Sequence, residues 1–419
     1  MSHTTVHGVA HGHGGAHNHT SFDGLGIAPK ILGILDSIKF NVPTPIQAKV
    51  IPLAIKGDDI VGIAQTGTGK THAFAVPIVQ TLARVRGNAL VLAPTRELAL
   101  QIDEVFKIIA QPFGIRTACL IGGDSMHKQF RALQRRPRII IGTPGRVQDH
   151  IDRRNVLLHD TSVLVLDEAD RMLDMGFAPQ VNKILSRIPT QRQTMLFSAT
   201  MAREIIDMAS QHMKMPVSVE IAPSGTTAER VTHELFIVKK EEKPRLLGKV
   251  LSEYRGSVLL FSRTRRNAHR VARMVREMNH AATEIHSDRT LAQRREALDG
   301  FKSGRYKVLI ATDIAARGID VMGIELVINY DLPDDTENYV HRIGRTGRAG
   351  HAGHAISFAT PDQRGNVRDI EKLIRIPLPI SKHPGISDNE FNKPSVVFSS
   401  ASRGGRMRSR LRRFRHPKH

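Results

Sequence analysis

The sequence predicts an α/β protein with two consecutive domains, each a parallel β-sheet covered by helices, and with disordered N- and C-terminal tails. Three observations support this fold class. Short apolar runs alternate with longer helical patterns, this alternation occurs twice along the 419 residues, and Gly, Pro or polar residues bound the runs. Continuous short apolar runs are typical of strands buried on both faces, as in doubly wound parallel sheets.

The first series of strands and helices lies in residues 21–218, which we assign to the first domain. Its clearest strand patterns are 89–93, 139–141, 163–166 and 194–197, and its clearest helical pattern is 97–110. The strand patterns are short and flanked by turn-forming residues, whereas the helical pattern repeats apolar residues every three to four positions.

The second series lies in residues 230–376 and predicts a second domain of the same class. Its strand patterns are 257–261, 307–311 and 326–329, and its helical patterns are 267–279 and 293–301. Residues 219–229 separate the two series and include a turn-rich stretch, so we expect a linker there.

Both ends of the chain are expected to be disordered. Residues 1–20 hold six histidines among small and polar residues, and they offer too little apolar surface to offset the entropy of ordering. These histidines either capture a metal or belong to a solvated leader. Residues 377–419 lose the hydrophobic periodicity and become rich in Pro, Ser and Arg, which predicts a flexible basic tail.

The charge of the chain predicts a polyanionic partner. Lys and Arg number 61 against 40 Asp and Glu, so the formal net charge is +21. Residues 21–227 contribute +6, residues 228–376 contribute +7, and residues 391–419 contribute +9. The basic tail therefore either tethers such a polyanion without sequence preference or merely keeps the chain soluble.

Several classes of protein are excluded by composition. No apolar run approaches the roughly 20 residues of a transmembrane helix, and the N-terminus lacks a secretory pattern. The single cysteine, Cys119, excludes an intramolecular disulfide and a zinc or iron–sulfur site built from cysteines. We therefore expect a cytoplasmic protein with no membrane partner.

A phosphate-binding loop is predicted at residues 64–71, Ala-Gln-Thr-Gly-Thr-Gly-Lys-Thr. Its glycines let backbone N–H groups wrap a phosphate, and the following helix N-terminus favours negative charge. Lys70 can reach the outer phosphates, and the Thr71 hydroxyl can bind Mg²⁺. The strict pattern has Gly where Ala64 stands, so a Gly-rich turn that binds nothing is the alternative.

Acidic residues follow the strand pattern at 163–166, in the order Asp167-Glu168-Ala-Asp170. The carboxyl end of a strand is where an α/β sheet presents ligands. Asp167 can hold Mg²⁺, partly through water, and Glu168 can polarise the water that attacks the γ-phosphate. An acidic loop that opens a helix is the alternative, but the phosphate loop about 100 residues earlier favours a nucleotide site.

With these motifs the chain resembles a DEAD-box RNA helicase of superfamily two, over residues 22–376. The resemblance implies two tandem RecA-like domains, with ATP and Mg²⁺ as cofactors. It also implies that RNA, duplex or single-stranded and bound with little sequence specificity, is the partner, and that ribosomal or ribonucleoprotein partners are conceivable.

The family's adenine-reading Q motif resembles residues 40–47, Phe-Asn-Val-Pro-Thr-Pro-Ile-Gln, with Phe22 as the upstream aromatic. The Gln47 amide would form a bidentate pair with adenine, and Phe40 would stack on the base or pack in the core. The ATP-binding residues that the resemblance implies are Phe40, Gln47, Ala64, Gln65, Thr66, Gly67, Thr68, Gly69, Lys70, Thr71 and Asp320.

The family's RNA-binding motifs also have counterparts in both domains. Turns after strands and helix starts can bind backbone phosphates through N–H groups, hydroxyls and guanidinium groups. The RNA-binding residues that the resemblance implies are Pro94, Thr95, Arg96, Gly122, Gly123, Thr143, Gly145, Arg146, Arg263, Arg294 and Thr312. Many members have Gln three residues before the position of Arg294, but this chain has Leu291, from which we expect no contribution.

Residues 339–348 resemble the family's motif with two arginine fingers, Arg345 and Arg348. These fingers would meet the γ-phosphate only when the two domains close, and they would raise the rate by about 10³–10⁵. The catalytic residues expected are Lys70, Asp167, Glu168, Arg345 and Arg348, and the residues expected to couple hydrolysis to strand separation are Ser198, Thr200, Asp170 and His341.

The sequence thus predicts an ATP-dependent RNA helicase that locally unwinds short duplexes or remodels RNA–protein complexes without processive translocation. An ATP-switched RNA clamp or chaperone is the alternative, and a DNA helicase is a third possibility. The opening residues 21–26, Ser-Phe-Asp-Gly-Leu-Gly, and the short extensions resemble a bacterial RhlE-type member.

Overall fold

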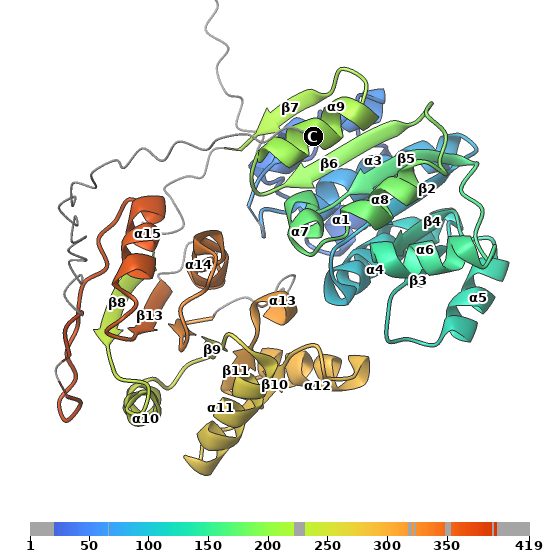
Figure 1. The fold of residues 1–419 in the computed structure, drawn as a ribbon. Helices are drawn as coiled ribbons and strands as arrows, with labels where there is room; N and C mark the ends of the chain where they lie inside the picture. The colour runs from blue at the N-terminus through green and yellow to red at the C-terminus, as the bar shows by residue number, and fades with distance from the viewer. Residues whose placement is uncertain are drawn as a thin grey trace, which may run out of the picture.

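In the computed structural model the strands and helices gather into two α/β domains, as the sequence predicts (Figure 1). The structure describes residues 21–65, 67–221, 231–316, 321, 324–347, 353–387 and 389–391. The predicted leader and the last 28 residues of the predicted tail lie outside these ranges.

The first domain is built on a 7-stranded parallel sheet with the order β3-β4-β2-β5-β6-β1-β7. Its strands are β1 (Ile60–Ile63), β2 (Asn88–Leu92), β3 (Thr117–Leu120), β4 (Ile139–Gly142), β5 (Thr161–Leu166), β6 (Gln193–Ser198) and β7 (Val217–Glu220). The four strand patterns read from this half of the sequence are all confirmed. Strand β7 pairs with β1 as far as Glu220, so the first sheet extends two residues into the expected linker.

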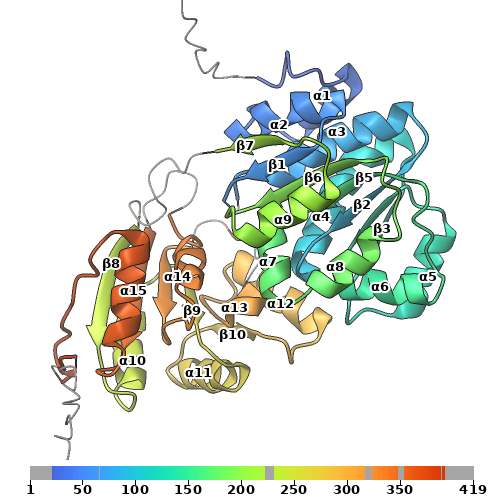
Figure 2. The same ribbon diagram turned by 45° about the horizontal axis from the view of Figure 1, so that its top comes forward.

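Helices cover both faces of this sheet (Figure 2). They are α1 (Pro29–Ser37), α2 (Pro45–Lys56), α3 (Lys70–Arg84), α4 (Arg96–Ala110), the 3₁₀ turn η1 (Gln111–Phe113), α5 (Met126–Gln134), α6 (Pro144–Asp152), α7 (Ala169–Asp174), α8 (Ala178–Leu185) and α9 (Arg203–His212). One hydrophobic cluster packs α1 to α4 against the sheet, and a second packs α5 to α9 against it.

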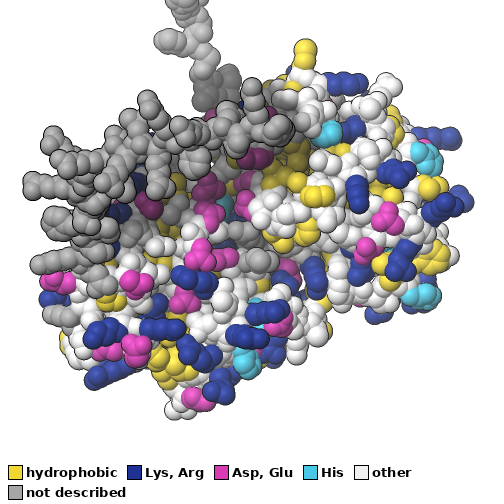
Figure 3. Space-filling view, viewed as in Figure 1, with side chains coloured by type: hydrophobic (Ala, Val, Ile, Leu, Met, Phe, Trp, Pro, Cys, Tyr) yellow, Lys and Arg dark blue, Asp and Glu magenta, His cyan; other side chains and the backbone are white. Residues whose placement is uncertain are grey.

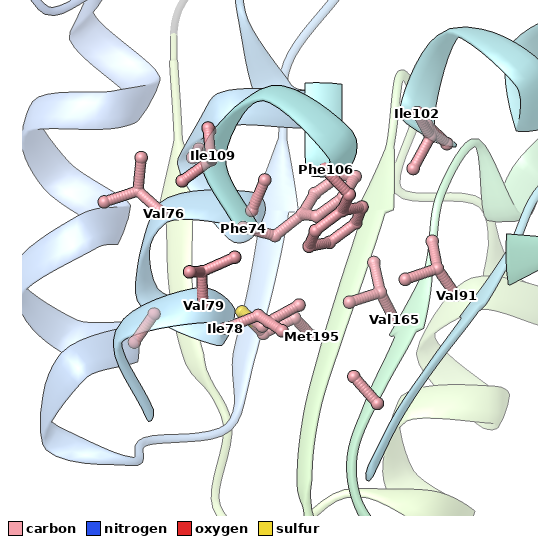
Figure 4. Close-up of a cluster of buried hydrophobic side chains, with 14 of the residues drawn as sticks. Phe74, Val76, Ile78, Val79, Val91, Ile102, Phe106, Ile109, Val165 and Met195 are labelled. Carbon is pink, nitrogen blue, oxygen red and sulfur yellow. The ribbon is translucent and has the colours of Figure 1, made fainter. Parts of the chain in front are cut away.

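Aromatic side chains form the centre of the first cluster (Figure 4). The rings of Phe74 on α3 and Phe106 on α4 lie 6.1 Å apart between centroids, and both side chains are fully buried. They pack toward Val165 of β5 and Met195 of β6. Because α3 begins at the phosphate loop and β5 ends at Leu166, directly before Asp167, this packing fixes two of the expected site segments relative to each other.

The second domain is built on a 6-stranded parallel sheet with the order β10-β11-β9-β12-β13-β8. Its strands are β8 (Val231–Ile237), β9 (Val258–Phe261), β10 (Ala282–Ile285), β11 (Val308–Ala311), β12 (Leu326–Asn329) and β13 (Gly353–Ala359). Its helices are α10 (Lys243–Glu253), α11 (Arg265–Glu277), α12 (Leu291–Lys302), α13 (Asp313–Ala316), α14 (Thr336–Ile343) and α15 (Arg364–Ile374). Helices α10 and α11 cover one face of the sheet, and α12 to α15 cover the other.

The two domains lie next to each other, and their boundary includes the carboxyl ends of strands in the first sheet (Figures 1 and 2). Helix α7 of the first domain lies beside α13 and α14 of the second domain in both views. The carboxyl ends of β5 and β6, which carry the expected catalytic and coupling residues, therefore lie at this boundary.

A C-terminal strap, defined here as residues 377–387 and 389–391, packs on the second domain and corrects the expectation of a flexible tail from residue 377. The backbone N–H of Leu235 on β8 donates to Pro379 O, and the N–H of Ser381 donates to Leu235 O, each at 2.8 Å. Side chains of Ile386 and Phe391 pack against the core of the domain. The strap shows no hydrophobic periodicity, because backbone pairing with β8 and two separate apolar side chains hold it in place. A sequence pattern of a helix or strand is therefore missing here.

Among the described residues, no helix combines the length and the apolar character that crossing a lipid bilayer requires.

Candidate functional site

The phosphate loop lies between β1 and α3, and Thr66 within it falls outside the described residues. Gly67 and Gly69 adopt φ angles of 86° and 90°, a region that favours glycine. A Cβ on Gly69 would lie 2.3 Å from Gln47 Nε2, so the loop has no room for a side chain there. Lys70 is 6% exposed, and its Nζ donates to Ala64 O at 2.9 Å, which holds the ammonium group inside the loop.

The remaining loop residues lie at the start of α3 or just before it. Thr68 Oγ1 donates to Gln65 O at 2.7 Å, and Thr71 is half-buried in the first turn of the helix. The loop thus brings backbone N–H groups, one ammonium group and one hydroxyl to a helix N-terminus, which is the arrangement that binds phosphate.

Gln47 on α2 lies directly beside the phosphate loop and is fully buried. Its Oε1 accepts from Thr44 N and its Nε2 donates to Gly69 O, each at 2.9 Å. Each end of the amide therefore has one remaining position for a further hydrogen bond. The expected bidentate contact with adenine would have to use these positions, and it stays a prediction.

Phe40 lies in a stack of three rings. Its centroid is 4.3 Å from that of His72, with 23° between the ring planes, and 5.6 Å from that of Phe22. Burial lowers the pKa of His72, so the neutral imidazole is favoured as the stacking partner. Phe22 is a buried core residue, whereas the stacking of Phe40 on a base stays a prediction.

Asp167 and Glu168 lie at the carboxyl end of β5 and are both buried. Burial raises the pKa of Asp167 to about 7, although the charge of Lys70 opposes this shift. Burial also favours the neutral form of Glu168, but the charges of Arg171, Lys70 and Arg345 outweigh it and lower its pKa. Two neighbouring carboxyl groups thus have pKa values pushed apart, which is typical of groups with different chemical tasks.

Asp170 connects this segment to the end of β6. Its Oδ2 accepts from Ala199 N at 2.9 Å and from Thr200 N at 3.2 Å. Ser198 is fully buried, and its carbonyl accepts from Ala64 N at 3.0 Å. The structure therefore joins the phosphate loop, the acidic segment and residues 198–200 in one hydrogen-bonded unit.

The second domain reaches this unit through α14. Arg171 Nη1 donates to Glu168 Oε2 at 2.8 Å, and Arg171 Nη2 lies 3.4 Å from His341 Nδ1. Arg345 is 3% exposed, and its charge contributes to the lowered pKa of Glu168. A cavity of about 210 Å³ lies between the domains here, and its lining includes Gln65, Ala199 and Arg345.

Two further predicted residues, Asp320 and Arg348, lie outside the described residues. Arg171 was not among the residues predicted from sequence. Its signal is weak, because an Arg three residues after a Glu on a helix is usually a local ion pair. Only the structure places it between Glu168 and the other domain.

The predicted RNA residues of the first domain gather at the ends of β2, β3 and β4. The guanidinium group of Arg96 lies over Gly122 and Gly123, where a Cβ on Gly123 would be 2.3 Å from Nη1. Thr95 follows the buried Pro94, and its hydroxyl accepts from Leu98 N at 3.2 Å and caps α4. These residues can still present N–H groups and a hydroxyl proton to a phosphate.

A second turn that could present N–H groups to a phosphate lies at the start of α6. Thr143 precedes the helix and is buried, whereas Gly145 has open space where a Cβ would stand. Arg146 Nη1 donates to Asp124 O at 3.0 Å, which ties this turn to the segment after Gly123. The predicted residues of the first domain thus share one edge of the sheet.

In the second domain, Arg263 and Thr312 follow β9 and β11, which are neighbours in the sheet. Arg263 is more than one-third exposed, and its Nη1 lies 3.4 Å from Asp334 Oδ1. Thr312 is half-buried, and its carbonyl accepts from Ala316 N in the first turn after β11.

Arg294 contacts the first domain in this arrangement, and its expected contact with RNA stays a prediction. Its Nη2 donates to Glu97 Oε2 at 2.8 Å, and the two side chains are 9% and 5% exposed. Leu291, from which nothing was expected, is 9% exposed and packs in the hydrophobic cluster of the first domain. No local pattern could reveal either contact, since the paired residues Glu97 and Arg294 lie 197 positions apart.

Positive charge is distributed over both domains. Lys and Arg side chains appear on both halves of the face seen in Figure 3, with acidic side chains among them. This agrees with the similar net charges that the two halves of the sequence carry.

Family comparison agrees with this geometry. The DEAD/DEAH box helicase family matches residues 44–208, and the helicase conserved C-terminal domain matches residues 242–350. The ATP-dependent rRNA helicase RRP3 of Debaryomyces hansenii is 43% identical over 360 residues, which are 85% of this chain and 74% of the relative. RRP3 of Scheffersomyces stipitis is 43% identical over 367 residues, 87% of this chain and 75% of the relative.

Solved structures show the same two-domain arrangement. S. cerevisiae Dbp5 bound to RNA and ADP BeF3 matches with a TM-score of 0.76 and 32% identity, over 86% of this chain and 95% of that one. Mss116p bound to ssRNA and AMP-PNP matches with a TM-score of 0.79 and 27% identity, over 87% of this chain and 80% of that one. With both helicase domains, the joined loop and acidic segments, and these relatives, the chain belongs to the DEAD-box family and is an ATP-dependent RNA helicase.

Proposed function

We propose that this helicase hydrolyses ATP at the boundary of its two domains and uses their closure to separate short RNA duplexes locally, or to remodel RNA–protein complexes. The observation that carries the proposal is the placement of Arg345 and His341, from the second domain, beside Glu168 and Arg171 of the first. A site assembled from both domains is complete only when they are together, so nucleotide chemistry and domain closure become one event.

The phosphates of ATP would lie in the loop 64–71, with Lys70 toward the outer phosphates and Gln47 and Phe40 toward the base. Oxygen donors for Mg²⁺ are available in the Thr71 hydroxyl and the Asp167 carboxylate, directly or through water, and hard oxygen ligands suit this ion. The buried Asp167 fits a cation, because a divalent charge would offset the burial that raises the pKa of Asp167. When bound, Mg²⁺ would neutralise charge on the phosphates.

In the hydrolytic step Glu168 would orient and polarise the attacking water. Its pKa is lowered, so the carboxylate is ionised and can accept a hydrogen bond from that water. Arg171 holds the carboxylate in place through the 2.8 Å ion pair. Arg345, and with it the predicted Arg348, would stabilise the charge that develops on the transferred phosphoryl group.

Coupling to RNA would pass through Asp170, which accepts hydrogen bonds from both Ala199 and Thr200. A shift of the acidic segment on hydrolysis would move residues 198–200 and loosen the contact with α14. The RNA surfaces at the ends of β2 to β4 and of β9 and β11 would then separate. Contacts to backbone phosphates and 2′-hydroxyl groups explain why little base specificity is expected.

An ATP-switched RNA clamp uses the same residues without requiring turnover, and a DNA helicase would accept single-stranded DNA as well as RNA. The variants Glu168→Gln and Lys70→Ala separate these possibilities. Glu168→Gln should bind ATP and RNA but lose turnover, whereas Lys70→Ala should lose turnover because the outer phosphates lose their ammonium partner. Glu104→Gln, at an exposed glutamate of α4, is the matched control.

The readouts are RNA-stimulated ATPase activity, unwinding of a short duplex and complementation in cells. Complementation by Glu168→Gln without hydrolysis would favour the clamp and contradict the helicase function in the cell. Equal stimulation by single-stranded DNA and RNA would favour the DNA helicase. Near-normal turnover by Lys70→Ala would contradict the loop assignment.

We further propose a cytoplasmic location and RNA–protein complexes as partners, with ribosomal RNA as the RNA of choice. The relatives named above carry rRNA helicase in their names, which supports ribosomal RNA. The one cysteine, Cys119, is a free thiol, which is compatible with a reducing compartment. The resemblance to a bacterial RhlE-type member stays a prediction, since these relatives are yeast proteins.

A further inference from the structure

A cleft of about 550 Å³ opens at the carboxyl edge of the second sheet, on the side of α11. Its size falls in the range of about 300–1,000 Å³ that ligand pockets commonly have. Its walls come from the first turns of α11, from Lys240 after β8, and from the turn after β13 that holds Thr360. We call it the α11 cleft.

Four exposed cations line the α11 cleft: Lys240, Arg263, Arg266 and Arg270. Arg266 and Arg270 stand four residues apart on α11, so they lie on one face of the helix. Arg270 Nη2 donates to Asn267 Oδ1 at 2.9 Å. Within the described part of the chain, Lys240 and Arg266 form no hydrogen bond and no ion pair, so their charges are available to a ligand.

The acidic residue at the base of the cleft does not cancel these charges. Asp331 is engaged by the protein itself: Lys243 Nζ lies 3.3 Å from Oδ1, while Arg263 N and Asn267 Nδ2 donate to Oδ2 at 3.1 and 2.9 Å. Asp362 is the other carboxylate of the lining. The cleft therefore carries an excess of positive charge and selects an anion.

The cleft continues the edge on which the predicted RNA residues of this domain lie. In the sheet, β11 and β9 carry Thr312 and Arg263 at their carboxyl ends, and β12, β13 and β8 follow in order toward the cleft. Arg263 itself lines the cleft. An RNA strand that is bound by Thr312 and Arg263 can thus extend into the cleft along this edge of the sheet.

The C-terminal strap ends at the same place. Ser387 Oγ donates to Glu242 Oε1 at 2.7 Å, and Glu242 lies between the cleft residues Lys240 and Lys243 in the sequence. The sequence that follows the strap, residues 392–419, carries a charge of +9. The strap therefore reaches the side of the basic cleft at Ser387, ahead of this basic sequence in the chain.

The lining offers charges but no exposed aromatic surface. Tyr330 is 2% exposed, and Lys243 Nζ lies 5.4 Å from its ring centroid. Base stacking, which requires a free ring, is not provided. We propose that the α11 cleft binds the phosphodiester backbone of single-stranded RNA that flanks the segment held by both domains.

This inference rests on the proposed function, and its test separates the two. The triple variant Lys240→Gln, Arg266→Gln, Arg270→Gln removes three of the four exposed cations and keeps Arg263, which is already a predicted RNA contact. Its control is Arg273→Gln with Lys302→Gln, two exposed cations of α11 and α12 outside the cleft lining. The affinity for RNA is measured with AMP-PNP at several salt concentrations. One RNA is short and fills only the site that both domains share, and the others are the same RNA extended at either end. Thermal unfolding checks that each variant is folded.

The triple variant should bind the RNA extended at one end roughly tenfold more weakly, and its salt slope should fall by about 2, since each phosphate contact adds about 0.7. Its affinity for the short RNA should equal that of the wild type. Equal loss for both lengths, or no loss for either, would overturn the inference while leaving the helicase function intact. Loss of binding to a poly-glutamate peptide with RNA binding unchanged would also overturn it and assign the cleft to an acidic protein. Failure of the wild type to bind either RNA would contradict the proposed function itself.

Discussion

The boundary between the two domains has two parts that are built differently. We call the part around Arg171 and His341, next to the expected ATP site, the ATP side, and the part around Glu97 and Arg294, next to the expected RNA residues, the RNA side. On the ATP side, Arg171 Nη2 lies 3.4 Å from His341 Nδ1 beside a cavity of about 210 Å³. On the RNA side, Arg294 and Glu97 form a buried ion pair at 2.8 Å, and Leu291 packs in the core of the opposite domain. The ATP side leaves a cavity that both polar and apolar side chains line, whereas the RNA side is closely packed.

This difference separates two tasks. A packed boundary with a desolvated ion pair has a defined geometry, because either charge left alone would be strongly unfavourable. Where the boundary instead holds a cavity and a long polar contact, its geometry depends on the molecule that is bound there. We therefore infer that the RNA side sets how the domains align, while the ATP side determines whether the closed arrangement is stable and active.

The largest effect is expected on the ATP side. Arg345→Ala should lower the rate of ATP hydrolysis by about 10³-fold or more, because the charge that develops on the phosphoryl group loses its arginine partner. ATP binding should change little, since the phosphate loop lies in the first domain. Single-turnover hydrolysis and nucleotide titration measure the two quantities. Arg368→Ala, at an exposed arginine of α15, should leave both unchanged, and normal hydrolysis by Arg345→Ala would remove the finger role.

An intermediate effect is expected at the buried ion pair. Glu97→Gln or Arg294→Gln should weaken RNA binding in the presence of AMP-PNP by on the order of 10–100-fold, because closure would bury one charge without its partner. RNA binding without nucleotide should change less, since both groups are hydrated when the domains are apart. The double variant should lose less than the sum of the single losses, and a double-mutant cycle measures this coupling. Additive losses would show that the pair does not form in solution.

The smallest effect is expected at Leu291. Leu291→Ala should reduce the same nucleotide-dependent RNA affinity by about fivefold, in keeping with loss of roughly 1 kcal/mol of apolar burial. Leu291→Met, which keeps most of the apolar volume, should restore most of the affinity. Fluorescence energy transfer between the domains measures closure directly. A Leu291→Ala protein that closes as readily as the wild type would show that this contact does not help to align the domains.

The fold could be predicted from sequence because both sheets are buried on both faces. Strands such as β5 and β11 are therefore continuous apolar runs between turn residues, and their boundaries agree with the sequence patterns to within one or two residues. The phosphate loop and the acidic segment could be located for a related reason. Each consists of consecutive residues at the end of a strand, so their spacing in the sequence already describes the site.

Contacts that depend on the second domain could not be predicted in this way. Glu97 and Arg294 each look like an ordinary charged residue in the first turn of a helix, and Leu291 looks like a helix residue facing its own domain. Gln47 and Phe40 were expected to contact adenine, which stays a prediction. Their present partners, Gly69 and His72, follow from packing that no short pattern encodes.

The C-terminal strap has a consequence for solubility and for the design of truncated proteins. Strand β8 is the last strand of the second sheet, and such a strand exposes unpaired N–H and C=O groups that can pair with another molecule. By bonding to Leu235, the strap occupies part of this edge. A chain shortened to residue 376 would expose the edge and should self-associate, whereas a chain shortened after residue 391 should stay monodisperse. Removal of the basic end should therefore begin beyond Phe391, so that a loss of RNA affinity is not confused with aggregation.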